Sequence, residues 1–332
     1  MADRTVADPR ASSDGVRVGA VDCGTNSIRL LVADVHPDTG ELADVVRRME
    51  IVRLGQGVDR AGVLDPEAIE RTLRAARSYA AQCRELGATS VRFVATSASR
   101  DARNAGDFTT GVRQTFREAF GAEVAPEVVS GDEEARLSFR GATGGLRVRG
   151  IDGPYLVVDL GGGSTEFVRG TTTVEAARSV DIGCVRMTER HHFSDPPTAE
   201  QVAAASADVD AAIDEAVGVV PLDGVQALVG LAGTVTTITA HALRLPAYDP
   251  DVIHLARVPV ERIHRAAADL LAMPRRERAR LPYMHPGRVD VIGAGALIWS
   301  RVVARVADTA GIAEVVTSEH DILDGIALSQ VS

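Results

Sequence analysis

Two short turns in this sequence combine an aspartate, glycines and hydroxyl side chains. The first is Asp22-Cys23-Gly24-Thr25-Asn26-Ser27, and the second is Asp159-Leu160-Gly161-Gly162-Gly163-Ser164. A turn of this kind fixes a carboxylate beside backbone N–H groups that can point at an anion. Phosphate oxygens fit such donors. We therefore predict phosphate binding at both turns; the alternative is that each is only a tight turn.

The two turns also match each other in sequence. When Asp22 is set on Asp159, Gly24 falls on Gly161 and a serine ends each turn, with apolar residues before and after. Each turn opens a different half of the chain. We interpret the match as an internal duplication.

Three carboxylates lie in or near these turns: Asp22, Asp159 and Glu166. Mg²⁺ is a hard cation that binds a few carboxylates together with phosphate oxygens and water. We expect Asp159 and Glu166 to be ligands of Mg²⁺, with Asp22 reaching the ion through water. The alternative is a structural role for each carboxylate in its turn.

A pair of adjacent glutamates stands out between the two turns. Ser130 is followed three residues later by Glu133, which matches a capping box at the start of a helix. A capping box occupies Glu133 and leaves Glu134 for other chemistry. The alternative is that both are solvated acids in a first helical turn, where the helix dipole favours them.

A third glycine-hydroxyl pair, Gly233-Thr234, lies between a predicted strand over Val225–Leu231 and a predicted helix starting near Val235. Backbone N–H groups at such a junction can hold a further phosphate or a ribose. A helix N-cap at Thr234 is the structural alternative.

Composition excludes several classes of function. All 36 basic residues are arginine, so a lysine-dependent P-loop, protein-kinase site or Schiff base is excluded in its usual form. The net charge of −10 argues against a broad nucleic-acid surface. No apolar run approaches the ~20 residues of a membrane helix. Three widely spaced cysteines fit a reduced cytoplasm better than a disulfide framework or zinc site.

The periodic elements favour an α/β chain of two domains. We expect a hairpin over Val16–Val35, a helix from the N-cap Asp65 to Gly87, and a loop over Thr96–Arg100. The expected division is a disordered tail over 1–15, a first domain over 16–132 and a second over 133–312. Residues 313–332 are expected to pack back on the first domain.

At this point the motifs resemble a known family. The two glycine turns, the segment Ser130-Gly131-Asp132-Glu133-Glu134-Ala135-Arg136-Leu137 and the segment Gly233-Thr234-Val235-Thr236-Thr237 are similar, in this order, to those of the exopolyphosphatase and guanosine pentaphosphate phosphohydrolase family. The resemblance runs from about Val18 to the C-terminus, without the additional C-terminal helical domains of longer members.

The resemblance implies a fold and roles for residues. The fold is two ribonuclease-H-like domains of the actin-like ATPase superfold with an interdomain cleft. Glu134 is implied as the general base that activates water, and Arg29 and Arg100 as phosphate contacts, with Arg288 a weaker candidate. The implied activity is Mg²⁺-dependent removal of terminal orthophosphate from inorganic polyphosphate. From composition we expect an enzyme of the cytoplasm that binds neither nucleic acid nor membrane.

Two rival functions stay open at this stage. The substrate can be guanosine pentaphosphate, or ATP and ADP, because one set of phosphate contacts suits any linear phosphoanhydride. In the other class of function, the chain is a nucleotide-dependent actin-like switch whose output is conformational. Preferred chain length, alarmone regulation and assembly, including a homodimer, are also left open.

Overall fold

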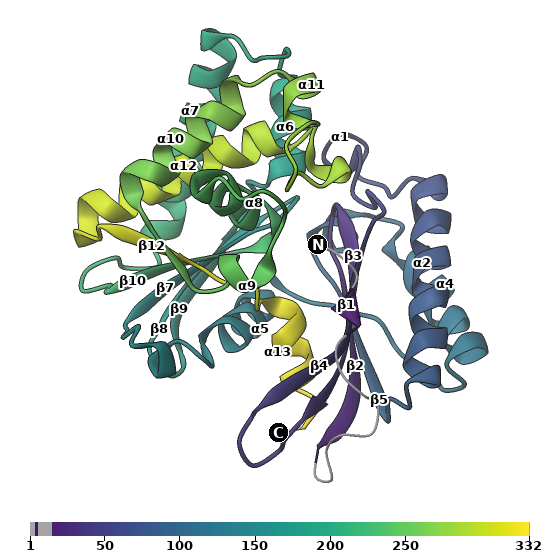
Figure 1. The fold of residues 1–332 in the computed structure, drawn as a ribbon. Helices are drawn as coiled ribbons and strands as arrows, with labels where there is room; N and C mark the ends of the chain where they lie inside the picture. Colours follow the sequence, from purple (N-terminus) through teal and green to yellow (C-terminus); the bar gives the residue numbers. More distant parts are fainter. Residues whose placement is uncertain (1–3, 6–14, 332) are drawn as a thin grey trace. The chain divides into compact units, whose positions relative to one another are not determined.

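The computed structural model describes residues 4–5 and 15–331. The chain divides into two compact units. Unit 1 is Met1–Gly141 with Ile322–Ser332, and unit 2 is Ala142–Asp321. Each unit is built around its own six-stranded sheet (Figure 1).

The elements of unit 1 are β1 (Arg4–Thr5), β2 (Val16–Cys23), β3 (Ser27–Val35), β4 (Leu42–Ile51), α1 (Val58–Ala61), α2 (Pro66–Glu85), β5 (Ser90–Ala95), α3 (Ser97–Asp101), α4 (Ala105–Ala119), β6 (Glu127–Val128), α5 (Gly131–Thr143), whose last residues belong to unit 2, and α13 (Ile322–Leu328). Its strand order is β1-β4-β3-β2-β5-β6. Strands β2, β3 and β4 are antiparallel neighbours, whereas β5 is parallel to β2 and β6 is parallel to β5.

Both faces of the unit 1 sheet are covered. Along β3, Ile28 and Leu30 point into a core shared with α2 and α4, while Leu31 and Ala33 point into a second core shared with α13. Alternate residues of a strand face opposite sides, so burial on both faces explains its nearly continuous apolar sequence. Figure 1 shows α2 and α4 side by side. Helix α13 packs against β2 and β3.

The predicted helix after Asp65 is confirmed. The Asp65 carboxylate accepts hydrogen bonds from the N–H groups of Glu67 and Ala68, and Pro66 occupies the first helical position. A side-chain cap of this kind contributes about 1 kcal/mol. The N-cap therefore sets where α2 begins.

The elements of unit 2 are η1 (Arg147–Arg149), β7 (Tyr155–Leu160), β8 (Thr165–Gly170), β9 (Val174–Val180), α6 (Cys184–His191), α7 (Ala199–Val217), β10 (Ala227–Leu231), α8 (Ala232–Leu243), α9 (Pro250–Ile253), β11 (Ala256–Pro259), α10 (Val260–Ala272), α11 (Arg275–Arg278), η2 (Pro286–Arg288), α12 (Ile292–Ala310) and β12 (Glu314–Thr317). The strand order is β11-β12-β10-β7-β8-β9. As in unit 1, an antiparallel hairpin leads the sheet and parallel strands extend it, here β10 beside β7 and β12 beside β10. The repeated topology supports the predicted duplication.

One apolar core in unit 2 joins the sheet to its helices. Leu156 and Val158 of β7, Leu228 of β10 and Trp299 of α12 belong to it, together with buried residues of α6, α7, α8 and α10. Gly230 lies against the Trp299 ring, where a side chain would not fit. The core fixes the strand ends that carry the second turn and the Gly233-Thr234 pair.

The observed domain boundaries differ from the expected ones. Leu137 of α5 packs in the unit 1 core beside α13, so the first boundary lies at Gly141 rather than after residue 132. Strand β12 pairs with β10 and β11, so residues 313–321 belong to unit 2 and only the chain from Ile322 returns to unit 1.

Local differences are also present. The segment expected as a loop over Thr96–Arg100 contains the short helix α3. In the expected tail over 1–15, Arg4–Thr5 pairs with β4, while 1–3 and 6–14 lie outside the described residues.

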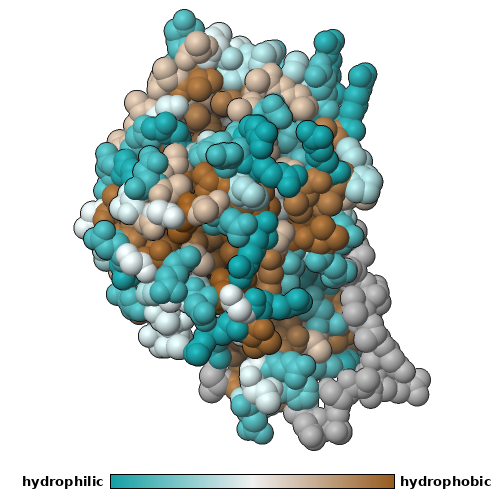
Figure 2. Space-filling view, turned by 60° about the vertical axis from the view of Figure 1, so that its left-hand side comes forward, coloured by the Kyte–Doolittle hydropathy of each residue, from teal (hydrophilic) through white to brown (hydrophobic). Residues whose placement is uncertain are grey.

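Large apolar side chains are exposed at only a few scattered positions of the described chain, of which Val148 is the most open at 89%. Figure 2 shows apolar patches broken by hydrophilic side chains on the face that it draws. In the described residues, every helix is too short or too polar to cross a membrane. Cys23, Cys83 and Cys184 are free and buried.

Candidate active site

The first glycine turn joins β2 to β3 in unit 1. The Gly24 N–H donates to the Ser27 carbonyl at 2.9 Å, so this group shapes the turn itself. The carbonyl of Thr25 accepts from the Gly55 N–H, and that of Asn26 accepts from the N–H groups after β4. The turn is thus held from behind through its carbonyls.

The Thr25 side chain is buried in the turn, and its hydroxyl shares a 2.8 Å hydrogen bond with the Ser97 hydroxyl at the start of α3. Gly55 approaches Thr25 so closely that a Cβ on Gly55 would overlap it. Ser97 and Gly55 were not predicted as site residues, because neither lies in a recognisable motif.

Asp22 lies opposite Arg29 in the β2–β3 ladder. Arg29 Nε and Nη2 both donate to Asp22 Oδ2, at 2.9 and 2.7 Å. Asp22 is 5% exposed. Asp22, the predicted water-mediated metal ligand, and Arg29, the predicted phosphate contact, therefore form a partly buried ion pair.

Glu134 lies in the first turn of α5 and is 8% exposed. Its Oε2 accepts from Arg100 Nη1 at 3.1 Å, and the same nitrogen donates to the Val129 carbonyl at 2.9 Å. The expectation of an uncommitted Glu134 side chain is wrong, because Arg100 of α3 binds it. The structure thus brings together the implied general base and an implied phosphate-contacting arginine.

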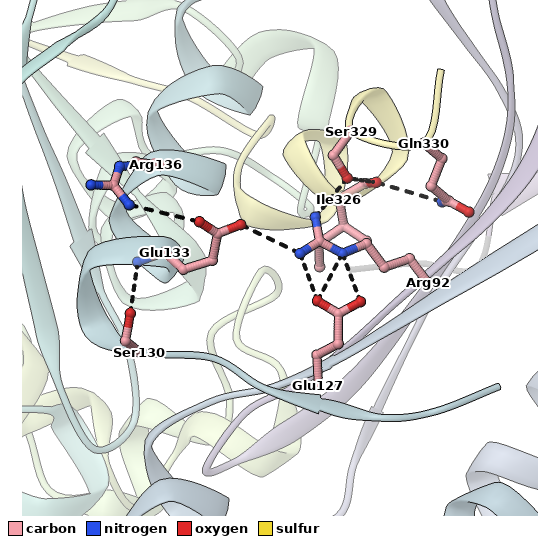
Figure 3. Close-up of polar contacts among 8 residues, drawn as sticks. All are labelled: Arg92, Glu127, Ser130, Glu133, Arg136, Ile326, Ser329 and Gln330. Carbon is pink, nitrogen blue, oxygen red and sulfur yellow. Dashed lines mark hydrogen bonds and ion pairs between the residues drawn. The ribbon is translucent and has the colours of Figure 1, made fainter. Parts of the chain in front are cut away.

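Glu133 lies in a separate network (Figure 3). Its N–H donates to Ser130 Oγ at 3.2 Å, which is half of the predicted capping box. Its carboxylate contacts Arg92 at 3.4 Å and Arg136 at 3.9 Å. Arg92 also binds Glu127 and the residues after α13. Glu133 therefore connects α5 to the sheet of unit 1, a structural role distinct from that of Glu134.

The second glycine turn, in unit 2, repeats the first. The Gly161 N–H donates to the Ser164 carbonyl at 3.0 Å. The carbonyls of Gly161 and Gly162 accept from N–H groups at the start of α6, and the Gly163 carbonyl accepts from Arg186 Nε at 2.7 Å. Within the part of the chain that the structure describes, the N–H groups of Gly162 and Gly163 meet no acceptor. These two N–H groups are donors suited to an anion.

Asp159 lies opposite Glu166 in the β7–β8 ladder. Both carboxylates are buried, with 7% and 1% exposure. Ser179 of β9, opposite Glu166 in the next ladder, donates to Glu166 Oε1 at 2.7 Å. Two neighbouring buried carboxylates concentrate negative charge, which a divalent cation can neutralise.

The predicted metal ligands do not form one cluster of protein side chains. No group of three or more His, Cys, Asp or Glu residues in the described chain is arranged to hold a metal ion. Asp159 and Glu166 remain as a pair in unit 2. A pair of carboxylates is compatible with Mg²⁺, which usually keeps several waters and takes its other ligands from substrate phosphates.

Gly233 and Thr234 lie in the first turn of α8, which begins earlier than expected, at Ala232. Thr234 is therefore inside the helix rather than its N-cap. The Arg288 guanidinium lies so close to Gly233 that a Cβ there would overlap it, and Arg288 Nη1 donates to Thr237 Oγ1 at 3.1 Å. Arg288 is 8% exposed, so its charge is buried beside the Gly233-Thr234 pair. Its sequence context did not indicate this position.

A model of the Ppx/GppA phosphatase family matches residues 31–330. Exopolyphosphatase 2 of Mycobacterium tuberculosis is 50% identical over 315 residues, which cover 94% of this chain and 98% of that protein.

Two solved structures are also similar. An exopolyphosphatase-like protein is 45% identical with a TM-score of 0.89, over 96% of this chain and 98% of that one. The Aquifex aeolicus Ppx/GppA family member is 29% identical with a TM-score of 0.77, over 95% and 97%. The predicted α/β fold of two similar domains is thereby confirmed. The chain is an enzyme that belongs to the Ppx/GppA phosphatase family.

Proposed function

We propose that this enzyme removes the terminal orthophosphate from inorganic polyphosphate. Support comes from the similarity to a protein named exopolyphosphatase along nearly the whole length of both chains. The single structural observation behind the mechanism is the buried Glu134 carboxylate held by Arg100 in the first turn of α5.

The reaction is a direct displacement by water. Glu134 takes a proton from a water molecule as the water oxygen forms a bond to the terminal phosphorus. The bond from that phosphorus to the bridging oxygen breaks, and the electron pair stays on the shortened chain. The products are orthophosphate and a chain that is one phosphate shorter, so no covalent enzyme intermediate is needed.

Arginines and turn amides bind the substrate in this proposal. Gly162 and Gly163 contribute their N–H groups, and Arg29, Arg100 and Arg288 contribute guanidinium groups for the non-bridging oxygens. The remaining predicted contacts are Thr25, Asn26, Ser27, Ser164, Gly233 and Thr234, while Gly24 and Gly161 shape their turns. Preorganised donors of this kind stabilise charge that develops in the transition state.

Asp159 and Glu166 would hold Mg²⁺ in unit 2, and Asp22 would act through water. When bound, the ion neutralises charge on phosphate oxygens. The fit rests on the chemistry of the pair: two buried carboxylates on adjacent strands, with the Ser179 hydroxyl fixing the orientation of Glu166.

The substrate is tested by a panel of short polyphosphate, long polyphosphate, ATP and guanosine pentaphosphate at one Mg²⁺ concentration. We expect orthophosphate release to have its highest kcat/KM with polyphosphate. A higher kcat/KM with guanosine pentaphosphate or ATP would contradict the proposed substrate while leaving the hydrolytic mechanism in place. Binding of these ligands without hydrolysis of any of them would instead favour the rival function, a nucleotide-dependent switch.

A further inference from the structure

A pocket of about 480 Å³ opens in unit 2 at the C-terminal end of α8. Its volume lies within the ~300–1,000 Å³ of small-molecule sites. The charged and aromatic side chains of its lining come from α8, α10 and the segments that follow α8 and α11: His241, Arg244, Arg262, Arg265, Asp269 and Tyr283.

The pocket concentrates positive charge in a chain whose net charge is −10. Across the described residues, Arg244, Arg262 and Arg265 have no ion pair with a carboxylate, although many arginines of this chain do. The Asp269 carboxylate in the lining lies 3.7 Å from His241 Nε2 instead. Three guanidinium groups are thus available around one cavity.

Hydrogen bonds to the last carbonyls of α8 do not explain the presence of all three arginines in the pocket. The Ala240 carbonyl accepts from the N–H groups of Arg244 and Leu245, and the Ala242 carbonyl accepts from Arg262 Nη2 at 2.6 Å. These bonds satisfy carbonyls of the last turn. The guanidinium group of Arg244 is not used for this purpose, and that of Arg265 makes only a 3.4 Å bond to the Glu261 carbonyl on its own helix.

The backbone conformation of Arg244 also indicates a ligand site. Its φ of 57° and ψ of 46° place it in the left-handed region, at a helix end where glycine is the usual residue. A strained position that carries a long cation is a reason to look for a ligand there.

His241 and Tyr283 form an uncharged wall of the pocket. The Tyr283 hydroxyl and His241 Nδ1 share a hydrogen bond of 2.5 Å, and the ring centroids are 6.0 Å apart. Burial lowers the pKa of His241 and raises the pKa of Tyr283, so both are neutral near neutral pH. The positive charge of the pocket therefore comes from its arginines.

We propose that this pocket is a second binding site for a phosphate chain. Guanidinium forks match the geometry of phosphate oxygens and bind them by charge-assisted hydrogen bonds. Gly233 and Arg244 are separated by α8, roughly 16 Å at the helical rise per residue. The site is therefore distinct from the Gly233-Thr234 junction.

Calorimetric titration of the full chain with methylenediphosphonate, in EDTA and near neutral pH, tests the site without turnover and without the Mg²⁺ proposed for Asp159 and Glu166. We expect the double variant Arg244→Gly with Arg265→Gln to bind at least about tenfold more weakly, because a hydrogen bond to a charged group contributes about that factor. Glycine suits the backbone at 244, so thermal unfolding should show a folded protein.

The control is Arg84→Gln, an exposed arginine of α2 in unit 1. Unchanged binding by the double variant, an equal loss in Arg84→Gln, or no metal-free binding by the wild type would each overturn the proposal. A second arm uses α,β-methylene ADP. Tighter binding of this analogue, lost in the double variant, identifies the ligand as a nucleotide; equal binding identifies it as an inorganic phosphate chain.

Discussion

Arg29 and Glu166 occupy the same position of the two repeated hairpins but carry opposite charges. Each lies directly across the ladder from the aspartate of its turn, Asp22 in unit 1 and Asp159 in unit 2. In unit 1 the aspartate is paired with an arginine, whereas in unit 2 the two opposed residues are both carboxylates. This difference of one side chain is the reason that we propose cation binding in unit 2.

Replacing Glu166 by glutamine should raise the Mg²⁺ concentration for half-maximal activity. The amide keeps the size of the side chain but removes one of two neighbouring charges. We expect an increase of at least about tenfold, comparable to the loss of other groups that support metal sites. Orthophosphate release measured across a Mg²⁺ titration checks this, with Glu175→Gln, an exposed acid of β9, as the control. An unchanged Mg²⁺ dependence would exclude Glu166 as a ligand.

Residue types and spacing named the residues of this candidate site, but they did not predict that Arg100 pairs with Glu134. The motif around Glu134 identified a candidate base, and the two turns identified neighbouring aspartates. The bond from Arg100 to Glu134 joins α3 to α5, and no local pattern in the sequence encodes such a contact. Long-range pairs of this kind depend on tertiary packing.

At the scale of elements, α6 holds the second glycine turn in place. N–H groups at the start of α6 donate to carbonyls of the turn, and Gly183, just before the helix, contacts the backbone of Gly162 and Gly163. Its carbonyls are bound by α6, which leaves the N–H groups of Gly162 and Gly163 as the donors that we propose for the substrate. The short helix α6 thus determines the conformation of a loop far from it in sequence.

Replacing Gly183 by alanine should separate α6 from the turn. A Cβ would lie within 3.0 Å of backbone atoms of Gly162 and Gly163, which cannot move aside like a flexible side chain. We expect orthophosphate release to fall by about 10²-fold, the effect of small misplacements in a preorganised site. The matched control is Gly144→Ala, where a Cβ meets no atom within 4 Å. Equal activity of the two variants would show that the contact is not required.

Element prediction from the sequence succeeded where local signals were strong. Asp65 with Pro66 predicted the start of α2, and the β-rich runs on either side of the first glycine turn predicted the β2–β3 hairpin. It failed at α8, where Thr234 resembles an N-cap although the helix begins at Ala232 with a φ of 69°. Gly233 packs against Arg288 in this turn, a long-range contact that local propensity does not include.

At the scale of the whole molecule, the same topology occurs in both units, and the chain returns to unit 1 only through α13. The matching glycine turns predicted the repeated topology. The return of the chain to unit 1 was predicted from residue 313, but it begins at Ile322. The apolar residues of β12 would suit either sheet, and only its pairing with β10 and β11 assigns it to unit 2. Domain boundaries thus depended on strand pairing rather than on composition.

The free energy of unfolding should fall in mild acid because His285 resists protonation in the folded chain. Burial, together with Arg288, lowers the pKa of His285 to about 4, and its Nδ1 accepts from the Gly287 N–H. In the unfolded chain the His285 imidazole takes up a proton near pH ~6.5, whereas in the folded chain it does so only near pH 4. The stability present above pH ~6.5 is therefore lost as the pH falls toward 4.

The variant His285→Asn keeps a hydrogen-bond acceptor without this titration. We expect the wild type to lose about 1 kcal/mol relative to this variant between neutral pH and roughly pH 5, a value reduced for partial exposure. Urea unfolding at each pH measures the difference. Parallel pH profiles of the two proteins would contradict the assignment.

The role of Glu134 in activating the attacking water is tested by the rate of orthophosphate release from polyphosphate by Glu134→Gln. The same rate is measured for Glu133→Gln, and polyphosphate binding is followed separately. We expect Glu134→Gln to bind polyphosphate but to be about 10²- to 10⁴-fold slower than the wild type. Glu133→Gln should keep its rate and lose about 1 kcal/mol of stability or less. A Glu134→Gln rate equal to that of the wild type would show that Glu134 is not the general base.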